Sequence, residues 1–391
     1  MTSGSKILHV IPSVGLERGG PSVFMRTLTR GLAGRGLEVH VATTDDNGSE
    51  RLDVDCGVPR AEEGATYWYF RRQTGIYTFS WPLTQWLARR VSDFELVHIH
   101  ALFSYAALPA ALCARRSGVP YIIRPLGTLN RWGMENRRPW LKKLSFRMVE
   151  SHILAGAAGI HYTSEQELIE ASELGVSKNA LLIPNAVDLP VGKAESVRGQ
   201  FRQRHPELEG RKIILFLSRL DRKKGVELLL EAFFLLQSRF PEAVLVLAGS
   251  GDASWVKQLR VHAVQLGITE RVFWTGFVGG DDKWAVLADA DVFVLPSYSE
   301  NFGIAALEAL ACGLPVVVSD QVGIHREIAA AEAGLVTRCH AEEIATALAK
   351  VLHDDGLRSR MRENGLRLAQ DHFSLDAVSR KLAAAYQDIL Q

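Results

Sequence analysis

The sequence has few cysteines and no long apolar run, and each shortage excludes a class of protein. No apolar stretch approaches the roughly 18 to 20 residues that cross a bilayer. The first residues, 1–6, lack the pattern of a secretory signal, so we expect a cytoplasmic protein. Neither a disulfide framework nor a zinc site is predicted, because four cysteines are far apart in 391 residues: Cys56, Cys113, Cys312 and Cys339.

The chain also lacks a net charge of either sign. Its 45 Lys and Arg residues nearly balance 44 Asp and Glu residues, so no overall field would attract nucleic acid. The exception is 101–150, which holds nine basic residues against two acidic ones. Within it, 131–147 interleaves basic residues with tryptophan and leucine. This pattern predicts peripheral contact with an anionic membrane, at the inner face of the cytoplasmic membrane, although an ordinary solvated helix is the alternative.

Short runs of Val, Ile and Leu alternate with helical segments, which is typical of parallel sheets buried on both faces. We expect an α/β fold of two Rossmann-like, doubly wound domains facing each other across a cleft, with ligands at the carboxyl ends of the strands. A turn at 183–188 places the boundary, giving domains 1–188 and 189–372, with a C-terminal helix at 373–391 that packs back onto the first domain. Aromatic-rich residues 67–86 are predicted as a loop and a helix. The predicted strands are 7–11, 39–43, 96–99 and 121–123, then 212–217, 244–248, 272–274, 292–295 and 316–318.

The most specific segment is 297–316, directly after a predicted strand. Its apolar spacing predicts a helix that starts near Gly303, whose free N–H groups and positive dipole end suit a diphosphate. Glu300 precedes this start and Glu308 follows it, about 12 Å along the axis if all eight residues were helical. One carboxylate would bind sugar hydroxyls and the other ribose hydroxyls. The alternative is a surface helix with two solvated glutamates.

Two further loops follow predicted strands. The loop 218–225 is rich in cations, and we expect Arg219 and Lys224 to bind the diphosphate, although a plain charged loop is the alternative. Near the N-terminus, Gly19 and Gly20 would let the backbone approach a phosphate or a sugar, and a purely structural turn explains them equally well. The absence of G-x-G-x-x-G lowers the odds of a nicotinamide or flavin enzyme.

Histidines and acidic pairs complete the candidates. We expect His98 and His100, at the end of a predicted strand, to lie on opposite faces of the sheet, so that at most one reaches a ligand. No Asp-x-Asp motif stands at a plausible strand end, and the pairs 45–46 and 281–282 are predicted to be loop charges. We therefore predict no metal, its place being taken by cationic side chains.

The combination of Glu300-x7-Glu308, Arg219 with Lys224, and the Gly19-Gly20 loop resembles glycosyltransferase family 4, a retaining family with the two-domain GT-B fold. The resemblance covers nearly the whole chain and is strongest over 212–325. It implies that 1–188 binds the acceptor and that 189–372 binds a nucleotide-sugar donor.

The resemblance also implies roles for individual residues. Arg219 and Lys224 would balance the leaving diphosphate, Glu308 would bind ribose, and Glu300 would hold the transferred sugar. His100 would contact the donor sugar, and Arg124 would substitute for a loop histidine that relatives often have where this chain has Leu126. Backbone groups would complete the donor site, at Phe302, Gly303 and Ile304 beside the sugar and at Gly276, Phe277 and Val278 beside the nucleobase.

The expected activity is a metal-independent, retaining hexosyl transfer to a lipid-linked or polysaccharide acceptor, in cell-envelope or exopolysaccharide biosynthesis. No cofactor is expected, and whether the donor carries UDP, GDP or ADP stays open because the contacts expected for the base are mostly backbone. A GT-B nucleotide-sugar epimerase and a catalytically silent nucleotide-sugar-binding protein are the alternatives. Both glutamates and both cations are present, which argues against the silent form.

Overall fold

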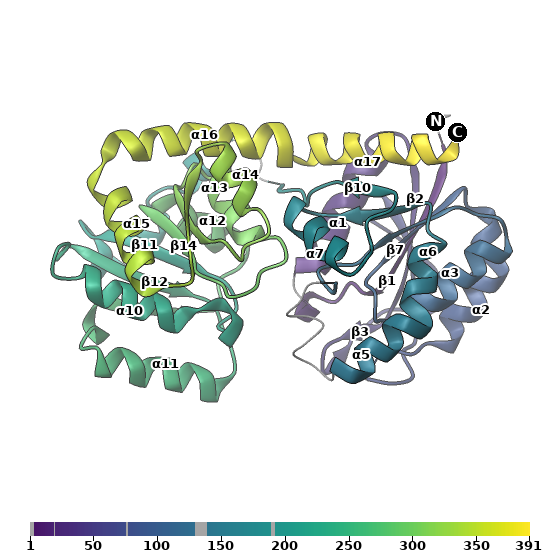
Figure 1. Ribbon diagram of the computed structural model, residues 1–391, viewed down its shortest axis with the longest axis horizontal. Coiled ribbons are helices and arrows are strands. Elements are labelled where there is room, and N and C mark those ends of the chain that lie inside the picture. Colours follow the sequence, from purple (N-terminus) through teal and green to yellow (C-terminus); the bar gives the residue numbers. More distant parts are fainter. Residues whose placement is uncertain (1–3, 19, 76, 130–138, 189–191) are drawn as a thin grey trace. The chain divides into compact units, whose positions relative to one another are not determined.

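The computed structural model describes residues 4–18, 20–75, 77–129, 139–188 and 192–391, which fold into two units (Figure 1). Unit 1 comprises Met1–Ala186 together with Leu375–Gln391, and unit 2 comprises Val187–Ser374. Among the described residues, none of the helices is both long enough and apolar enough to span a membrane.

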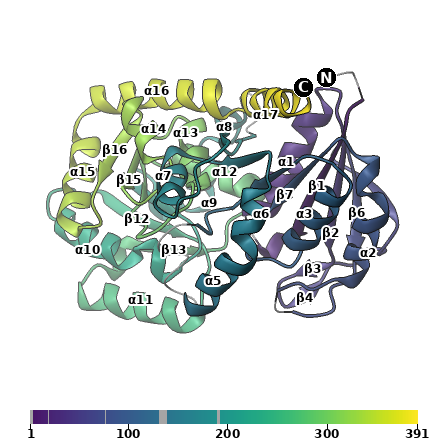
Figure 2. The ribbon, with the colours of Figure 1, turned by 45° about the vertical axis from the view of Figure 1, so that its right-hand side comes forward.

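Unit 1 is built on an eight-stranded sheet in which every neighbouring pair is parallel except β5 and β6 (Figure 2). Its strands in spatial order are β10 (Ala180–Leu182), β9 (Gly159–Tyr162), β8 (Tyr121–Arg124), β7 (Leu96–His100), β1 (Lys6–Ser13), β2 (Glu38–Thr44), β6 (Ala65–Phe70) and β5 (Pro59–Glu62). A separate two-stranded ribbon joins β3 (Asp46–Asn47) to β4 (Glu50–Arg51).

Helices cover both faces of this sheet, as the near-continuous apolar strands require. One face packs against α1 (Gly20–Ala33) and α17 (Leu375–Leu390), which lie side by side. The opposite face packs against α2 (Trp81–Arg90), α3 (Ala107–Arg116) and α6 (Ser151–Ala155). Two other α-helices of the unit lie in its described residues, α5 (Pro139–Ser145) and α7 (Glu165–Glu173).

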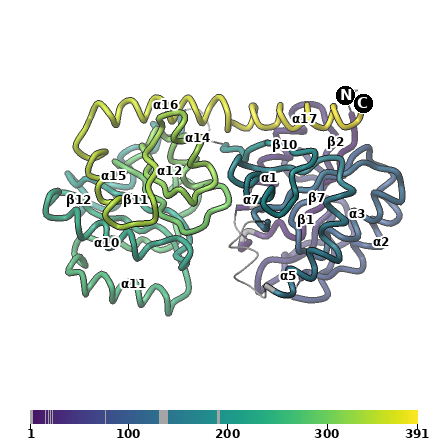
Figure 3. Tube along the Cα trace, in the orientation of Figure 1, coloured from purple at the N-terminus to yellow at the C-terminus, as the bar shows by residue number. Residues whose placement is uncertain are grey.

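Unit 2 has a six-stranded, wholly parallel sheet. The spatial order is β13 (Val272–Gly276), β12 (Ala243–Ala248), β11 (Lys212–Leu217), β14 (Val292–Leu295), β15 (Val316–Ser319) and β16 (Gly334–Thr337). Its described α-helices are α8 (Lys193–Val197), α9 (Gln200–Arg204), α10 (Val226–Leu236), α11 (Ala253–Gln265), α12 (Gly280–Asp289), α13 (Ile304–Ala311), α14 (His325–Ala330), α15 (Ala341–His353) and α16 (Asp355–Phe373). Helix α15 packs on α10 and on α16 (Figure 3). Helix α16 also packs on α13.

Two Rossmann-like units with parallel sheets confirm the predicted α/β class, and every predicted strand is present. The prediction of a loop from residue 67 was wrong, because Ala65–Phe70 forms β6, where aromatic side chains are well accommodated. Six further strands were not predicted, β3, β4, β5, β9, β10 and β16, and each has only two to four residues. Runs that short carry little periodicity, so sequence patterns detect them poorly.

Candidate functional site

The start of α13 in unit 2 is fixed by a glycine. Gly303 has φ +99°, and a Cβ added there would lie 2.7 Å from the Val322 side chain, so only glycine fits. The helix begins at Ile304, close to the predicted start, and its first amide N–H groups have no acceptor within the helix. Glu300 lies outside the helix in a bridge with Val322, so the segment from Glu300 to Glu308 is a loop followed by a helix.

Glu300 forms an ion pair with Lys224, which follows β11 in the loop 218–225. The Lys224 side chain is 6% exposed and that of Glu300 is 20% exposed. Burial opposes ionisation of Glu300, but Lys224, Lys223 and Arg219 outweigh it and hold the pKa of this carboxyl below its ordinary value. Glu300 is therefore an ionised hydrogen-bond acceptor within a group of cations.

The loops after the neighbouring strands β11 and β14 contact each other directly. The backbone N–H of Tyr298 donates to the carbonyl of Lys223 at 2.8 Å. Gly225, with φ +65°, passes so close to Pro296 that an added Cβ would lie 2.2 Å from its carbonyl oxygen. This contact brings the cations of the first loop beside Glu300 and the start of α13, at the carboxyl edge of the sheet where parallel α/β sheets bind ligands.

Arg219 and Glu308 differ in their ion pairing. Arg219 is exposed, and within the described part of the chain its guanidinium has no ion pair. Glu308 forms an ion pair with Lys283 of α12 at 2.6 Å. Burial raises the pKa of Glu308, and Lys283 offsets part of that rise.

Sequence reasoning missed Lys283. It follows Asp281 and Asp282, whose assignment as loop charges was wrong: they occupy the first turn of α12, where acidic residues favour the helix dipole. Their carboxylates pair with Lys193 at 2.8 Å and Arg204 at 2.6 Å. Lys283 reaches Glu308 from a different helix, so the contact depends on the tertiary fold and no local sequence pattern predicts it.

The other predicted donor-binding residues are dispersed. Gly276 ends β13 with φ +72°, and its carbonyl accepts a hydrogen bond from the N–H of Gly249 at 2.7 Å. Phe277 is 80% exposed and Val278 is half-buried. Phe302 is buried, with its ring edge-on to Phe373, and Ile304 is half-buried.

The predicted glycine loop belongs to unit 1. Gly20 is the exposed first residue of α1, and Gly19 lies outside the described residues.

In unit 1, His100 lies among three other fully buried histidines. Strand register pairs His9 of β1 with His98 of β7, and His161 is on β9. The rings of His98 and His100 are stacked, with centroids 4.3 Å apart. The prediction that they lie on opposite faces was wrong, because strand side chains alternate with a period of two and residues two apart share a face.

Arg124 lies in the same buried group, two strands from β1. Its guanidinium stacks on the Phe24 ring at 4.0 Å and donates a hydrogen bond to Asn185. Burial lowers the pKa of Arg124 to about 10, although Glu167 acts in the opposite direction. Arg124 is therefore a cation of the unit 1 core, and a ligand could contact it only in the interior of that unit.

The histidines also offer a candidate metal site. His9, His98 and His100 place one ligand atom each within 4.8 Å of one another. A metal ion there would lie beside the buried positive charge of Arg124, which already opposes protonation of these rings, after the larger effect of burial. That charge makes the group a poor cation site.

A pocket of about 310 Å³ opens at the carboxyl ends of β1, β7 and β8. Among the described residues, five of the eight non-glycine residues with positive φ line it: Tyr77, Thr78, Ala101, Phe103 and Leu126. Backbone conformations of this kind cost about 1–3 kcal/mol each and gather at functional sites.

Two acidic groups adjoin this pocket. Asp46 lines it, is fully buried, and pairs with Arg72 and with Arg18, whose Nε lies 2.6 Å away. The assignment of 45–46 as loop charges was therefore wrong. Glu150 is buried, and one of its carboxylate oxygens has no hydrogen-bond partner in the part of the chain that the structure describes. Burial raises the pKa of Glu150 to about 7, with the Phe103 backbone and Ser145 opposing that rise.

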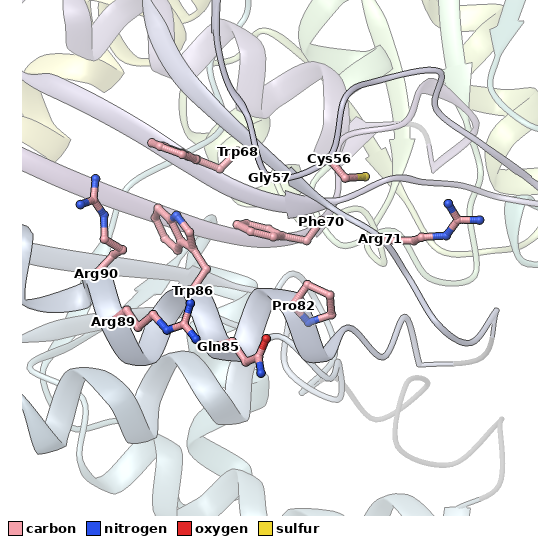
Figure 4. Close-up of a pocket in the computed structure, with 10 residues that line it drawn as sticks. All are labelled: Cys56, Gly57, Trp68, Phe70, Arg71, Pro82, Gln85, Trp86, Arg89 and Arg90. Atoms are coloured by element: carbon pink, nitrogen blue, oxygen red, sulfur yellow. The ribbon is translucent and has the colours of Figure 1, made fainter.

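A second pocket of unit 1, of about 590 Å³, lies between β6 and α2 (Figure 4). The rings of Trp68, Phe70 and Trp86 line it together with the guanidiniums of Arg89 and Arg90. None of the described residues that the sequence predicted to bind a ligand lines this pocket.

Comparison with known proteins matches both units. A family model described as "Glycosyl transferases group 1" matches residues 197–367, and one described as "Glycosyl transferase 4-like domain" matches 19–186. The chain is 36% identical over 188 residues to an uncharacterized glycosyltransferase, MJ1607, of Methanocaldococcus jannaschii, a match covering 48% of this chain and 47% of that protein. This match therefore spans about half of the relative's length.

Two further proteins match over nearly the whole chain. A D-inositol 3-phosphate glycosyltransferase of Jonesia denitrificans is 27% identical over 96% of this chain and 92% of its own length. The crystal structure of Anabaena Alr3699/HepE in complex with UDP and glucose superposes with a TM-score of 0.77 at 17% identity, covering 98% of this chain and 99% of that one. This structural likeness concerns the fold.

Proposed function

Because the chain belongs to the group 1 glycosyltransferases of family 4, with the GT-B fold, we propose that it is a retaining transferase that needs no metal ion. It moves a sugar from a nucleoside-diphosphate donor to a lipid-linked or polysaccharide acceptor. The observation that carries the proposal is the group of cations at the start of α13. Arg219, Lys223 and Lys224 all act on the carboxylate of Glu300 beside that helix start.

The proposed chemistry follows from this charge distribution. Departure of the nucleoside diphosphate builds negative charge on its phosphates, and Arg219, Lys224 and the amide groups that open α13 stabilise that charge where it develops. Such fixed positive charge takes the place of a metal ion. Glu300, held ionised, accepts hydrogen bonds from hydroxyls of the transferred sugar.

Three further groups complete the proposed donor contacts. Glu308, positioned by Lys283, binds the ribose hydroxyls, and the backbone at 276–278 meets the nucleobase. In unit 1, His100 contacts the donor sugar. The named complex of the Anabaena relative with UDP supports a nucleoside diphosphate as the leaving group.

For the acceptor we propose the 310 Å³ pocket of unit 1, because two of its strained lining residues, Ala101 and Phe103, follow His100 directly in the chain. We further propose that 131–147 contacts an anionic membrane. Residues 130–138 lie outside the described part, but α5 and the turn after it expose Trp140 (67%), Leu144 (53%) and Met148 (65%) together with Lys143 and Arg147. An exposed apolar stripe flanked by cations suits a surface of acidic lipids, and thus an acceptor held there.

A thermal-shift screen across UDP, GDP, ADP and their sugars identifies the donor, because a ligand that binds the folded state raises the midpoint. Incubation with that donor then separates the functions. A transferase releases nucleoside diphosphate rapidly only with an acceptor, an epimerase converts the sugar unaided, and a silent binder does neither. Nuclear magnetic resonance of the product gives its anomeric configuration, and turnover that persists in EDTA supports metal independence. An inverted product or turnover abolished by EDTA would refute the corresponding part of the proposal.

A further inference from the structure

The buried histidines of unit 1 are joined by hydrogen bonds into one continuous chain. It starts at the carbonyl of Ile183, 2.7 Å from Nε2 of His161, and continues from Nδ1 of His161 to Nε2 of His98 at 3.3 Å. Nδ1 of His98 lies 2.7 Å from the hydroxyl of Tyr386 on α17, and that hydroxyl lies 3.4 Å from Nε2 of His9. Nδ1 of His9 finally lies 3.0 Å from Nε2 of His100.

All four imidazoles are neutral in this environment. The rings are fully buried. Burial is the largest cause that lowers each pKa, and the nearby charge of Arg124 adds to it for all four. A neutral imidazole has one N–H donor and one nitrogen acceptor. Each ring that makes two hydrogen bonds can therefore donate only one of them.

The direction of every bond then follows from the first one, since a carbonyl can only accept. His161 must donate through Nε2, which leaves its Nδ1 as an acceptor for the Nε2–H of His98. The free Nδ1 of His98 accepts from the Tyr386 hydroxyl, whose oxygen accepts from the Nε2–H of His9. Nδ1 of His9 is left as an acceptor, so His100 must donate through Nε2. No other proton arrangement keeps all five bonds with neutral rings.

We propose that this chain fixes His100 in the Nε2–H tautomer and leaves a lone pair on its Nδ1 as a hydrogen-bond acceptor for a ligand hydroxyl. A second observation agrees with this assignment: Nδ1 of His100 is buried and has no partner among the described residues. An unpaired buried nitrogen is costly, and it is expected where a ligand supplies the missing partner.

The hydroxyl donor that we assign is a sugar hydroxyl, and this part rests on the proposed function. An Nδ1–H tautomer would present a donor instead, and a ligand hydroxyl would then have to accept a hydrogen bond from it rather than donate one. His9, His98, His161 and Tyr386 are thus positioning residues, which set the proton on His100 without reaching the ligand. The histidine chain differs from a metal site because seven of its eight ring nitrogens are occupied by hydrogen bonds.

The histidine tautomers can be observed directly in the full-length protein without substrate. In protein labelled with ¹⁵N-histidine, long-range ¹H–¹⁵N spectra distinguish a protonated from an unprotonated ring nitrogen. We expect His9, His98, His100 and His161 all to be neutral and protonated at Nε2. Protonation of His100 at Nδ1, a charged ring in the chain, or stoichiometric zinc whose removal shifts these signals would each overturn the proposal.

Substitution of Tyr386 tests the chain itself. Tyr386→Phe removes one link, so His161 and His98 stay anchored to Ile183 while His9 and His100 lose their constraint and populate both tautomers. The matched control is Tyr67→Phe, which removes another buried tyrosine hydroxyl of unit 1. The Tyr67 hydroxyl bonds to Thr29 at 3.3 Å and is not part of the histidine chain. Tyr67→Phe should leave all four tautomers unchanged. Equal spectra for Tyr386→Phe and the wild type would overturn the proposal.

Kinetics separate this inference from the proposed function. Tyr386→Phe should lower kcat/KM for the donor by about 2- to 10-fold, the value of one neutral hydrogen bond, while Tyr67→Phe leaves it within about 2-fold. If the spectra show the expected tautomers but kcat/KM is unchanged, the sugar contact of His100 is refuted and the tautomer assignment is supported. If no turnover occurs with any donor, the proposed function fails and the spectra still decide the tautomer.

Discussion

Replacing Lys224 by methionine removes the cation nearest to Glu300 while keeping most of the buried side-chain volume. In a fully buried ion pair, loss of one partner costs about 3–5 kcal/mol. We expect a smaller loss of about 1–3 kcal/mol in the free energy of unfolding, because the Glu300 side chain is 20% exposed and Lys223 and Arg219 still act on it. The same substitution should remove a larger fraction of the free energy of donor binding. A charge-assisted hydrogen bond contributes about 1.5–3 kcal/mol, so affinity for the nucleoside diphosphate should fall by roughly 10- to 100-fold.

Urea denaturation and isothermal titration with the nucleoside diphosphate measure the two effects separately. The control is Arg222→Ala in the same loop, which makes the same change in charge, but whose guanidinium stacks on Trp255 at 4.1 Å. It should change donor affinity by less than about 3-fold, since exposed charges contribute little. The double variant Arg219→Ala with Lys224→Met should nearly abolish turnover. Intact turnover and donor affinity in that double variant would refute the proposed mechanism.

Three further predictions concern acid stability, loop geometry and the membrane. The pKa values of His9 and His161 are lowered to about 3 by burial and by Arg124, so below about pH 6.5 the unfolded chain binds protons that the folded chain does not. Stability should therefore fall with acidification by about 1.4 kcal/mol per pH unit for each histidine, and His161→Gln should flatten that slope in denaturation curves; an equal slope would show that His161 titrates normally. Gly225→Ala, facing the Pro296 carbonyl, should destabilise by about 3 kcal/mol, whereas Gly267→Ala, with φ +66° and no atom within 4 Å of the added Cβ, should cost only about 1 kcal/mol of backbone strain. Equal thermal midpoints for these two alanine variants would contradict the close approach of the two loops. Finally, Lys143→Glu with Arg147→Glu should reduce co-sedimentation with liposomes of acidic lipid, compared with Lys257→Glu in α11 as the control; unchanged binding would remove the membrane contact.

The features that the sequence predicted well are those that depend on a short stretch of residues. Strand β11 is a continuous apolar run, and Gly303 marks a helix start that follows a strand, so both can be located from a short window. The cations of 218–225 and Glu300 could likewise be placed at one site, since loops at the carboxyl edge of one parallel sheet lie near one another. Short strands such as β9 offered no comparable signal.

Contacts between distant elements needed the fold. Lys283 becomes the partner of Glu308 only in the tertiary fold, since the two residues lie on different helices, and Asp46 is buried only because Arg18 and Arg72 converge on it from separate segments. The sequence by itself determined two parallel α/β units and indicated the residues that we propose for chemistry at the edge of the second, because apolar periodicity and strand-end motifs are local properties. Only the tertiary structure decided which proton His100 carries, because that depends on histidines of β1 and β9 and on Tyr386, 286 residues along the polypeptide from His100, all meeting in one buried core.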